Sequence, residues 1–324
     1  MPELPPYINR EDNQALVTPA ALKGSSLYFF PVRADIPAQQ AMVDRFLNRP
    51  SGGAVDYRAF FPQVFFMFGY YQRLFSLGYP DAGRGYFSYR ESGIWVPTIE
   101  VEKRGGLTVG TRLVMYPAYM FVDDSHALIS GREVQGWPKE FAQMAVSEDP
   151  QQAAYFDIRP KVLKTFSPTT EAKEEKLVSF RQIPDSGASF PAEVFTEVAA
   201  AAAGIGYFLS NGGLGLNLPT AQLLLNVASI PIAGMQFGFL KQFRDGINPD
   251  RACYQAGLEA RLKPTKFRSA GLLKGAYDLS IFRADSHPIV KQFGMDPFDF
   301  QGVRGFWTDA DVELENAVER WSRT

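Results

Sequence analysis

Cysteine and histidine are nearly absent from this sequence. Its 324 residues include one cysteine, Cys253, and two histidines, His126 and His287. A lone cysteine excludes a disulfide within the chain and a metal cluster held by thiolates. Two histidines argue against a histidine-rich metal site, and a Ser-His-Asp triad would have to use one of them. We therefore expect no metal centre.

The sequence also lacks a strong charge of either sign and a long, clean apolar run. Its formal net charge of −2 gives no field that would attract nucleic acid or an acidic membrane. The longest apolar stretch, residues 223–240, is interrupted by Asn226, Pro231 and Gln236, whereas a membrane span needs about 20 apolar residues. The first residues do not resemble a secretory signal. We expect a soluble, cytoplasmic protein without a nucleic-acid or membrane partner.

Aromatic residues are abundant, at 14% of the chain with 27 phenylalanines. Composition alone does not distinguish a thick apolar core from an apolar binding cavity. No internal repeat and no linker rich in proline, glycine or serine divides the chain, so we expect one domain over residues 1–324.

Short runs of β-branched and aromatic residues dominate the middle of the chain. Residues 60–78 are apolar almost throughout and fit either a buried strand or a buried helix. Turn signals lie at Ser92-Gly93, Gly105-Gly106 and Asp123-Asp124. Strands are predicted at 27–35, through most of 85–160, and near 221–230, 253–263 and 275–283.

Three helices are predicted. Residues 36–48 follow Asp35 as the N-cap and have Pro37 in the first turn. Residues 191–204 and 308–321 carry apolar residues at helical spacing. Many short strands with few helices predict a mainly β (α+β) fold, an antiparallel barrel or curved sheet with helices outside, rather than a doubly wound parallel sheet.

Two glycine-rich stretches do not complete a nucleotide-binding motif. Residues 204–209 and 212–218 each end in leucine where G-x-G-x-x-G has its last glycine, and no Walker A sequence occurs. We expect no nucleotide, flavin or other cofactor. Glu100 and Glu102, two apart on a predicted strand, should share a face, most simply a solvated edge. His287 is interpreted as a turn histidine rather than a catalytic acid.

Lys139 stands among apolar residues in GREVQGWPKEF, residues 131–141. A lysine attacks a ketone only as the neutral amine, and a free lysine has a pKa of about 10.4. Enzymes lower that pKa by burial or with a neighbouring cation. The local sequence also fits a surface lysine whose stem lies over an aromatic ring, and on that sequence alone the surface interpretation is favoured.

A wider pattern resembles the acetoacetate decarboxylase family. Residues 119–141 are similar to the heart of that family, with a Tyr/Met-rich strand, an acidic turn, G-R-E, an aromatic residue and P-K. YRESG at 89–93 resembles its Tyr-x-Glu-Ser-Gly segment, and VRAD at 32–35 resembles an early strand end. Residues 252–264 resemble the C-terminal half of long members. The chain therefore looks like a divergent long member.

The resemblance implies a fold and a site. The fold is a cone-like antiparallel β-barrel of the acetoacetate decarboxylase-like type, with additional peripheral helices and the reactive lysine in its apolar interior. Lys139 matches the Schiff-base lysine, and Glu91 matches the active-site glutamate. Arg132 and Glu133 match the pair that supports the site, and Trp137 belongs to the same segment. By analogy, a homo-oligomer is expected.

Three departures from the family pattern concern charge. Glu140 stands where the family has a second lysine, and a carboxylate near the amine would favour the ammonium form. Counting along the sequence places the position of the family's early arginine near Ser25 and the position of another family glutamate near Met67. The resemblance thus implies a larger, more apolar site than acetoacetate requires.

These observations leave three functional hypotheses. The first is a Schiff-base lyase that uses Lys139 to decarboxylate a small-molecule keto acid bulkier than acetoacetate. The second is an aldolase-dehydratase that uses the same lysine with a pyruvate-like keto acid and an aldehyde. The third is a non-catalytic barrel that binds an apolar ligand, in which Lys139 is a relic or an anion clamp. The protonation state of the amine distinguishes catalysis from binding.

Overall fold

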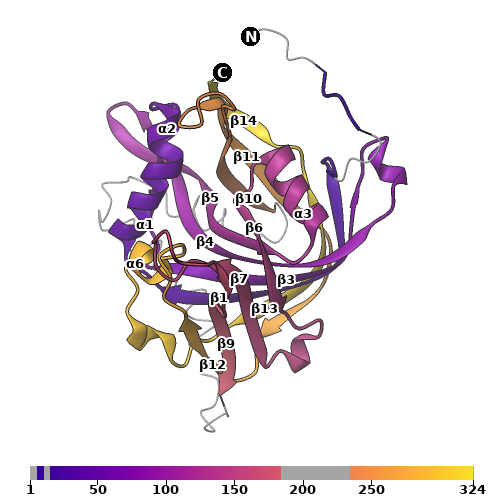
Figure 1. Ribbon diagram of the computed structural model, residues 1–324, viewed down its shortest axis with the longest axis vertical. Helices are drawn as coiled ribbons and strands as arrows, with labels where there is room; N and C mark the ends of the chain where they lie inside the picture. The colour runs from indigo at the N-terminus through magenta and orange to yellow at the C-terminus, as the bar shows by residue number, and fades with distance from the viewer. Residues whose placement is uncertain (1–5, 11–14, 184–233, 324) are drawn as a thin grey trace.

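A single branched sheet organises the chain, and its central strands close into a ring (Figure 1). The computed structural model describes residues 6–10, 15–183 and 234–323. The ring strands are β1 (Ala20–Arg33), β3 (Gln63–Ser76), β4 (Phe87–Arg104), β5 (Leu107–Val122), β10 (Met235–Arg244), β11 (Ala252–Leu272) and β13 (Phe306–Leu314). The mainly β fold and its closure confirm the predicted architecture.

The ring is antiparallel except at one junction. Neighbouring strands from β10 through β11, β13, β1, β3 and β4 to β5 pair antiparallel. Within the described residues, β10 and β5 close the circle through a parallel contact between Phe237 and Met115. Short strands β2 (Tyr57–Ala59) and β14 (Val318–Arg323) extend it on β4 and β11.

The strands alternate between two apolar layers. On β1, Leu27 and Phe29 face the interior of the ring, whereas Tyr28 and Phe30 face outward. All seven ring strands contribute to the inner cluster. A strand with two buried faces reads as a continuous apolar run, which explains why residues 60–78 showed no period. They contain β3.

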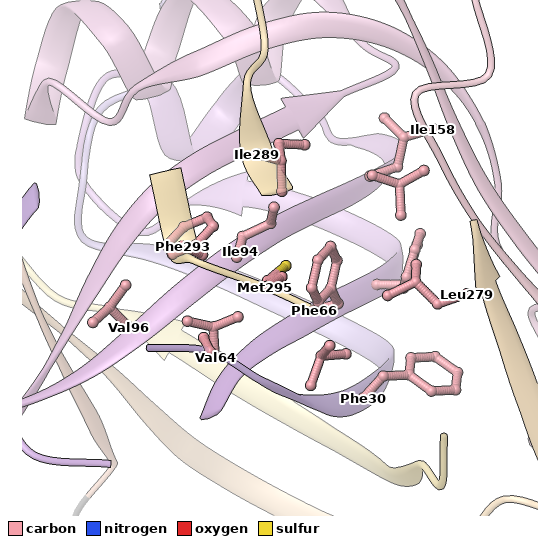
Figure 2. Packing of buried hydrophobic residues seen from close by; sticks show 14 of the residues in the cluster. Phe30, Val64, Phe66, Ile94, Val96, Ile158, Leu279, Ile289, Phe293 and Met295 are labelled. Atoms are coloured by element: carbon pink, nitrogen blue, oxygen red, sulfur yellow. The ribbon is translucent and has the colours of Figure 1, made fainter. Parts of the chain in front are cut away.

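A second sheet covers the outer face of the ring. It consists of β6 (Lys139–Ala145), β7 (Tyr155–Val162), β9 (Val178–Ile183) and β12 (Ala276–Ile281), with the short β8 (Lys173–Glu174) on β7. Figure 2 shows Phe66 and Ile94 of the ring packing toward Ile158 and Leu279 of this sheet and toward Phe293. Many of the phenylalanines therefore fill a core between two layers.

Helices lie at the periphery. They are α1 (Ile36–Val43), α2 (Arg49–Ser51), α3 (Ser125–Ser130) and α6 (Ile289–Phe293), with π-helical turns η1 (Asp44–Asn48) and η3 (Gly131–Gln135) and 3-10 turns η2 (Asp81–Gly83), η4 (Pro150–Gln152) and η5 (Pro297–Phe300). The helix predicted at 36–48 is confirmed, since Asp35 accepts a hydrogen bond from the Ala38 amide at 2.8 Å. No helix in the described part is long and apolar enough to cross a membrane.

The helix predicted at 308–321 is wrong. Strand β13 and strand β14 occupy this region. Ala310 and Val312 are buried at a period of two, because β13 pairs with both β1 and β11. Asp311 is not part of a capping box but accepts the Gly24 amide at 2.9 Å. Pairing with distant strands overrode the local helical spacing.

Three smaller predictions also fail. Residues after the Asp123-Asp124 turn form α3, not a strand, because Asp124 caps the Ala127 amide at 3.0 Å. Ser92-Gly93 lies inside β4 rather than in a turn. A register shift after Glu100 breaks the alternation, so Glu100 is buried while Glu102 is exposed. The helix predicted at 191–204, the strand near 221–230 and the glycine-rich stretches at 204–218 lie outside the described residues.

Two buried glutamates, two half-buried arginines and a buried tyrosine form a network that joins β2, β4, β5, β11 and β14. Arg112 lies 2.5 Å from both Glu100 and Glu259, and Arg320 contacts the same carboxylates at 2.7 and 3.5 Å. Tyr57 donates to Glu259 at 2.5 Å. Two arginines offset two glutamates, so neither carboxylate is left uncompensated.

We predict that Arg112→Leu lowers the free energy of unfolding by about 2–3 kcal/mol in urea titration. Removing one partner of a buried ion pair costs about 3–5 kcal/mol, and Arg320 remains to offset part of it. Arg104→Leu, which breaks the exposed pair with Glu102, should cost about 0.5 kcal/mol or less. Equal effects of the two substitutions would contradict a structural role for the network.

Candidate active site

Lys139 and Glu91 form a buried ion pair inside the ring. The Lys139 Nζ atom lies 2.7 Å from Glu91 Oε2, and each side chain is less than a tenth exposed. Lys139 opens β6, next to Met120 of β5, while Glu91 projects from β4 on the same face as Tyr89. The amine also lies 5.5 Å from the centroid of the Tyr89 ring. The structure thus places the lysine in the interior, contrary to the surface interpretation that its local sequence favoured.

Gly131 gives the lysine stem its path. A Cβ atom at this position would stand 2.6 Å from Lys139 Cδ and 2.8 Å from Cε. The φ angle of Gly131 is −63°, which any residue adopts, so close approach of the lysine stem is the constraint on this position. Five residues later, Gly136 has φ of +84° and turns the chain out of η3 toward β6.

Arg132 and Trp137 hold the segment around Lys139. Arg132 Nη1 donates to the Lys139 carbonyl oxygen at 2.9 Å. The Trp137 ring stacks on Phe239 with centroids 4.5 Å apart, and its indole nitrogen donates to Gln135. Gln135 in turn donates to the Glu315 carbonyl at 3.2 Å. These contacts connect the lysine segment to β10 and to the residues after β13.

Glu133 and Glu140 make their contacts elsewhere. Glu133 accepts a hydrogen bond from the Tyr7 hydroxyl. Glu140 is the next residue after Lys139 on a strand, so its side chain lies on the opposite face, where Oε2 is 3.0 Å from His287 Nε2. Glu140 therefore does not form the ion pair with the amine that its sequence position suggested. His287, at the end of a turn as interpreted, is buried against it.

Two stacked tyrosines complete the surroundings of the ion pair. The rings of Tyr71 and Tyr89 lie 4.8 Å apart. Burial, and secondarily the charge of Glu91, raises the pKa of both phenols well above the ordinary value. Both phenols therefore remain neutral in the pH range in which a lysine titrates, and neither competes with Glu91 for the charge of Lys139.

A cavity of about 50 Å³ adjoins Lys139. Ring strands β1, β3, β4 and β13 form its sides, α3 and η3 cap it, and Leu16 and Thr18 line it on the N-terminal side. Its walls are mostly apolar, but it is smaller than the enlarged site expected from the sequence. Ser25 and Met67, where family charges were expected, are buried and uncharged.

Lys241 on β10 holds the cap of this cavity. Its ammonium group donates to the Val134 carbonyl at 2.7 Å. Burial lowers the pKa of Lys241, against the opposing charge of Glu133. Within the described ranges, no group of three or more histidine, cysteine, aspartate or glutamate side chains is placed to hold a metal ion.

Several residues of the site were missed by sequence reasoning. Gly131 was present in the quoted motif, but nothing in the pattern showed that the lysine stem passes over it. Tyr89 was also quoted, and its alternation with Glu91 on one strand gives the signal that both face the same way. Leu16 and Thr18 are far from the motif, and no local signal identifies them.

The chain belongs to the acetoacetate decarboxylase family. The model of that family matches residues 4–236, more than half of the sequence. No curated protein sequence matches the chain.

Solved structures share the fold at low sequence identity. An acetoacetate decarboxylase from Legionella pneumophila subsp. pneumophila str. Philadelphia 1 has a TM-score of 0.55 and 13% identity, covering 98% of this chain and 92% of that one. The enduracididine biosynthesis enzyme MppR complexed with pyruvate has a TM-score of 0.52 and 13% identity, covering 96% and 93%. A further acetoacetate decarboxylase structure has a TM-score of 0.50 and 12% identity, covering 95% and 91%.

We predict that Gly131→Ala displaces the Lys139 amine while leaving the fold intact. The new methyl group would overlap the flexible lysine stem rather than backbone, so the stem moves away from Glu91. Covalent trapping of a ketone on Lys139, followed by mass spectrometry, should slow at least about tenfold, because misplacing a reacting group by about 1 Å costs about 100-fold. Gly246→Ala, with no atom within 4 Å of its new Cβ, should match the parent protein. Equal trapping in both variants would contradict the steric role of Gly131.

Proposed function

We propose that this chain is a Schiff-base-forming lyase in which Lys139 decarboxylates a β-keto acid. The observation that carries the proposal is the Lys139–Glu91 pair, an amine and a carboxylate 2.7 Å apart inside an apolar ring. A charged pair of this kind gains little stability over apolar residues of similar volume, so its presence points to chemistry.

Glu91 is placed to make the amine reactive. Transfer of one proton across the 2.7 Å contact yields a neutral amine and a neutral acid without bringing in an outside base. The amine then attacks the substrate ketone, and the hydroxyl of the resulting carbinolamine leaves as water with the proton held on Glu91, which forms the cationic iminium and restores the carboxylate. The cleaved carbon–carbon bond releases CO2 and leaves its electron pair in a neutral enamine. A proton taken up from solvent through Glu91 adds to the enamine carbon, and addition of water to the resulting iminium releases the ketone and restores the paired ammonium group and carboxylate.

The apolar walls favour loss of a carboxylate over its retention. Among the described residues that line the cavity, Lys139 is the only one with a positive charge. An iminium and a carboxylate become a neutral enamine and CO2, so charge disappears in this step, and a weakly polar site favours that change. A pyruvate-type aldolase keeps its carboxylate throughout and gains from a separate cation that holds it.

The aldolase-dehydratase hypothesis is the second candidate. It shares every step up to the iminium, from which loss of a proton from the α carbon, rather than loss of CO2, gives an enamine that attacks an aldehyde. The similarity of fold to MppR complexed with pyruvate is the observation in its favour. The apolar-ligand barrel is less well supported, because Lys139 is already paired with Glu91 at 2.7 Å and is not left to hold the anionic group of a ligand.

The proposal predicts a covalent adduct on Lys139. Incubation with acetoacetate, larger β-keto acids, pyruvate or acetone, followed by borohydride reduction, should add the mass of the reduced ketone to the peptide that contains residue 139. Lys139→Ala should give no adduct and no CO2 release. CO2 release from the β-keto acids assigns decarboxylation, whereas adduct formation with pyruvate and consumption of an aldehyde assign the second candidate. Absence of any adduct would exclude both enzymes.

A second prediction separates the two roles of Glu91. Glu91→Gln removes the internal proton acceptor but also the counter-charge of the ammonium group, and in an apolar site the loss of that charge itself favours the neutral amine, so adduct formation with acetone should persist. CO2 release should fall about 100-fold, since a positioned acid or base contributes about 10²–10⁴. Glu102→Gln, an exposed change on the same strand, should leave both rates unchanged. If both rates fall together in Glu91→Gln, Glu91 only positions the lysine.

A further inference from the structure

The strand that carries Lys139 has a single strand neighbour at the point where the lysine stands. Among the described strands, residues 139–141 of β6 pair only with β5, and pairing with β7 begins at Ala142. A residue paired along one edge is held by fewer ladder hydrogen bonds than a residue inside a sheet. The position of the amine opposite Glu91 therefore depends on contacts outside the ladder.

Two main-chain contacts hold Lys139 from its own segment. Arg132 Nη1 donates to the Lys139 carbonyl at 2.9 Å, and the Lys139 amide donates to the Trp137 carbonyl at 2.7 Å. Both partners precede the lysine closely in the sequence, so these contacts fix the local conformation of the chain. They do not by themselves fix where this segment stands relative to the second sheet.

Glu140 supplies a contact to a distant part of the chain. Its side chain projects to the outer face of β6, where Oε2 lies 3.0 Å from Nε2 of His287, 147 residues further along the sequence. The carboxylate is about half exposed, whereas the imidazole is buried. Phe121 and Tyr119 of β5 flank the imidazole, with ring centroids 5.9 and 6.2 Å from it. The enclosed imidazole therefore offers Glu140 a fixed partner.

His287 is itself fixed by the residue that precedes it. Ser286 Oγ accepts the Leu163 amide at 3.0 Å and lies 2.8 Å from His287 Nδ1. Since the hydroxyl oxygen accepts from Leu163, its hydrogen can point to Nδ1, and the hydrogen of the neutral imidazole is then on Nε2, where it donates to Glu140. The Ser286 amide also donates to the Leu163 carbonyl at 3.3 Å. A chain of hydrogen bonds thus connects the end of β7 to the residue after Lys139.

We propose that His287 is a positioning residue for Lys139 and acts through Glu140. Neighbouring residues on a strand project to opposite faces, so holding the Glu140 carboxylate on the outer face fixes the direction in which the Lys139 stem leaves the inner face. The buried imidazole thereby keeps the amine at its 2.7 Å contact with Glu91. This inference rests on the proposed function for what the amine does, but the placement of the strand does not require catalysis.

Two substitutions at His287 separate positioning from the filling of space. The side-chain nitrogen of glutamine can reach the place of Nε2, whereas that of asparagine reaches only the place of Nδ1. His287→Asn should therefore slow both acetone trapping on Lys139 and CO2 release at least tenfold, since misplacing a reacting group by about 1 Å costs about 100-fold. His287→Gln should recover both rates to within about threefold of the parent protein. In His287→Asn, kcat should fall with KM nearly unchanged, because His287 lies on the face of β6 opposite the amine.

Amide hydrogen exchange measures the placement of the strand without catalysis. In His287→Asn, the amides of residues 139–141 should exchange about fivefold faster, as expected for the loss of a hydrogen bond of about 1 kcal/mol. Glu140→Ala removes the same contact from its half-exposed side and should have the same effect. The double variant should exchange no faster than either single variant, because the two side chains act as one unit. His126→Asn, at the half-exposed histidine of α3, is the matched control and should change neither exchange nor chemistry.

The two kinds of measurement can fail separately. A normal rate of adduct formation in His287→Asn would overturn the positioning role while the proposed function stands. Equal losses in His287→Asn and His287→Gln would also overturn it, because the imidazole would then only fill space. Faster exchange of residues 139–141 in His287→Asn, with no ketone adduct even in the parent protein, would reject the proposed function and support the placement of the strand by His287.

Discussion

The burial of the Lys139–Glu91 pair is the constraint on which the rest of the structure depends. Two opposite charges 2.7 Å apart remain in an apolar interior only when the surrounding elements fix their geometry. Glu91 comes from β4 and Lys139 from the first position of β6, and β5 lies between them. The pair therefore forms only when three segments have assembled, and the chemistry depends on the completed sheet rather than on a local loop.

The branching of the sheet at β5 explains how the lysine enters the ring. One edge of β5 pairs with β4, and the other contacts β10 near Met115 and β6 from Met120 onward. At this branch the chain passes from the ring to the second sheet, so β6 has one face toward each layer. Lys139 takes the inner face, and Glu140 takes the outer face beside His287. The same alternation separates the two charges that the sequence places side by side.

The sequence predicted the secondary structure correctly where local features of the chain decided it. Turn residues and β-branched runs located most strands of the middle region, and Asp35 with Pro37 located α1. The motif around Lys139 indicated the family. Prediction from the sequence failed where pairing with a distant strand decided the secondary structure, as in residues 308–321, whose strands pair with β1 and β11. The burial of Lys139 depends on its path over Gly131 and on the closed ring, and the cavity volume depends on Leu16, so neither could be read from a local pattern.

The ring and the cavity walls differ in how freely they can evolve. The charged pair comes from β4 and β6, whereas the cap formed by α3 and η3 and the residues 16–18, which also line the cavity, lie outside the strands. Substitutions in those two segments can reshape the space around the amine without altering the register of the sheet. A fold with this division can change what the cavity accepts while it keeps the Lys139–Glu91 pair, and selection or design can act on one segment at a time.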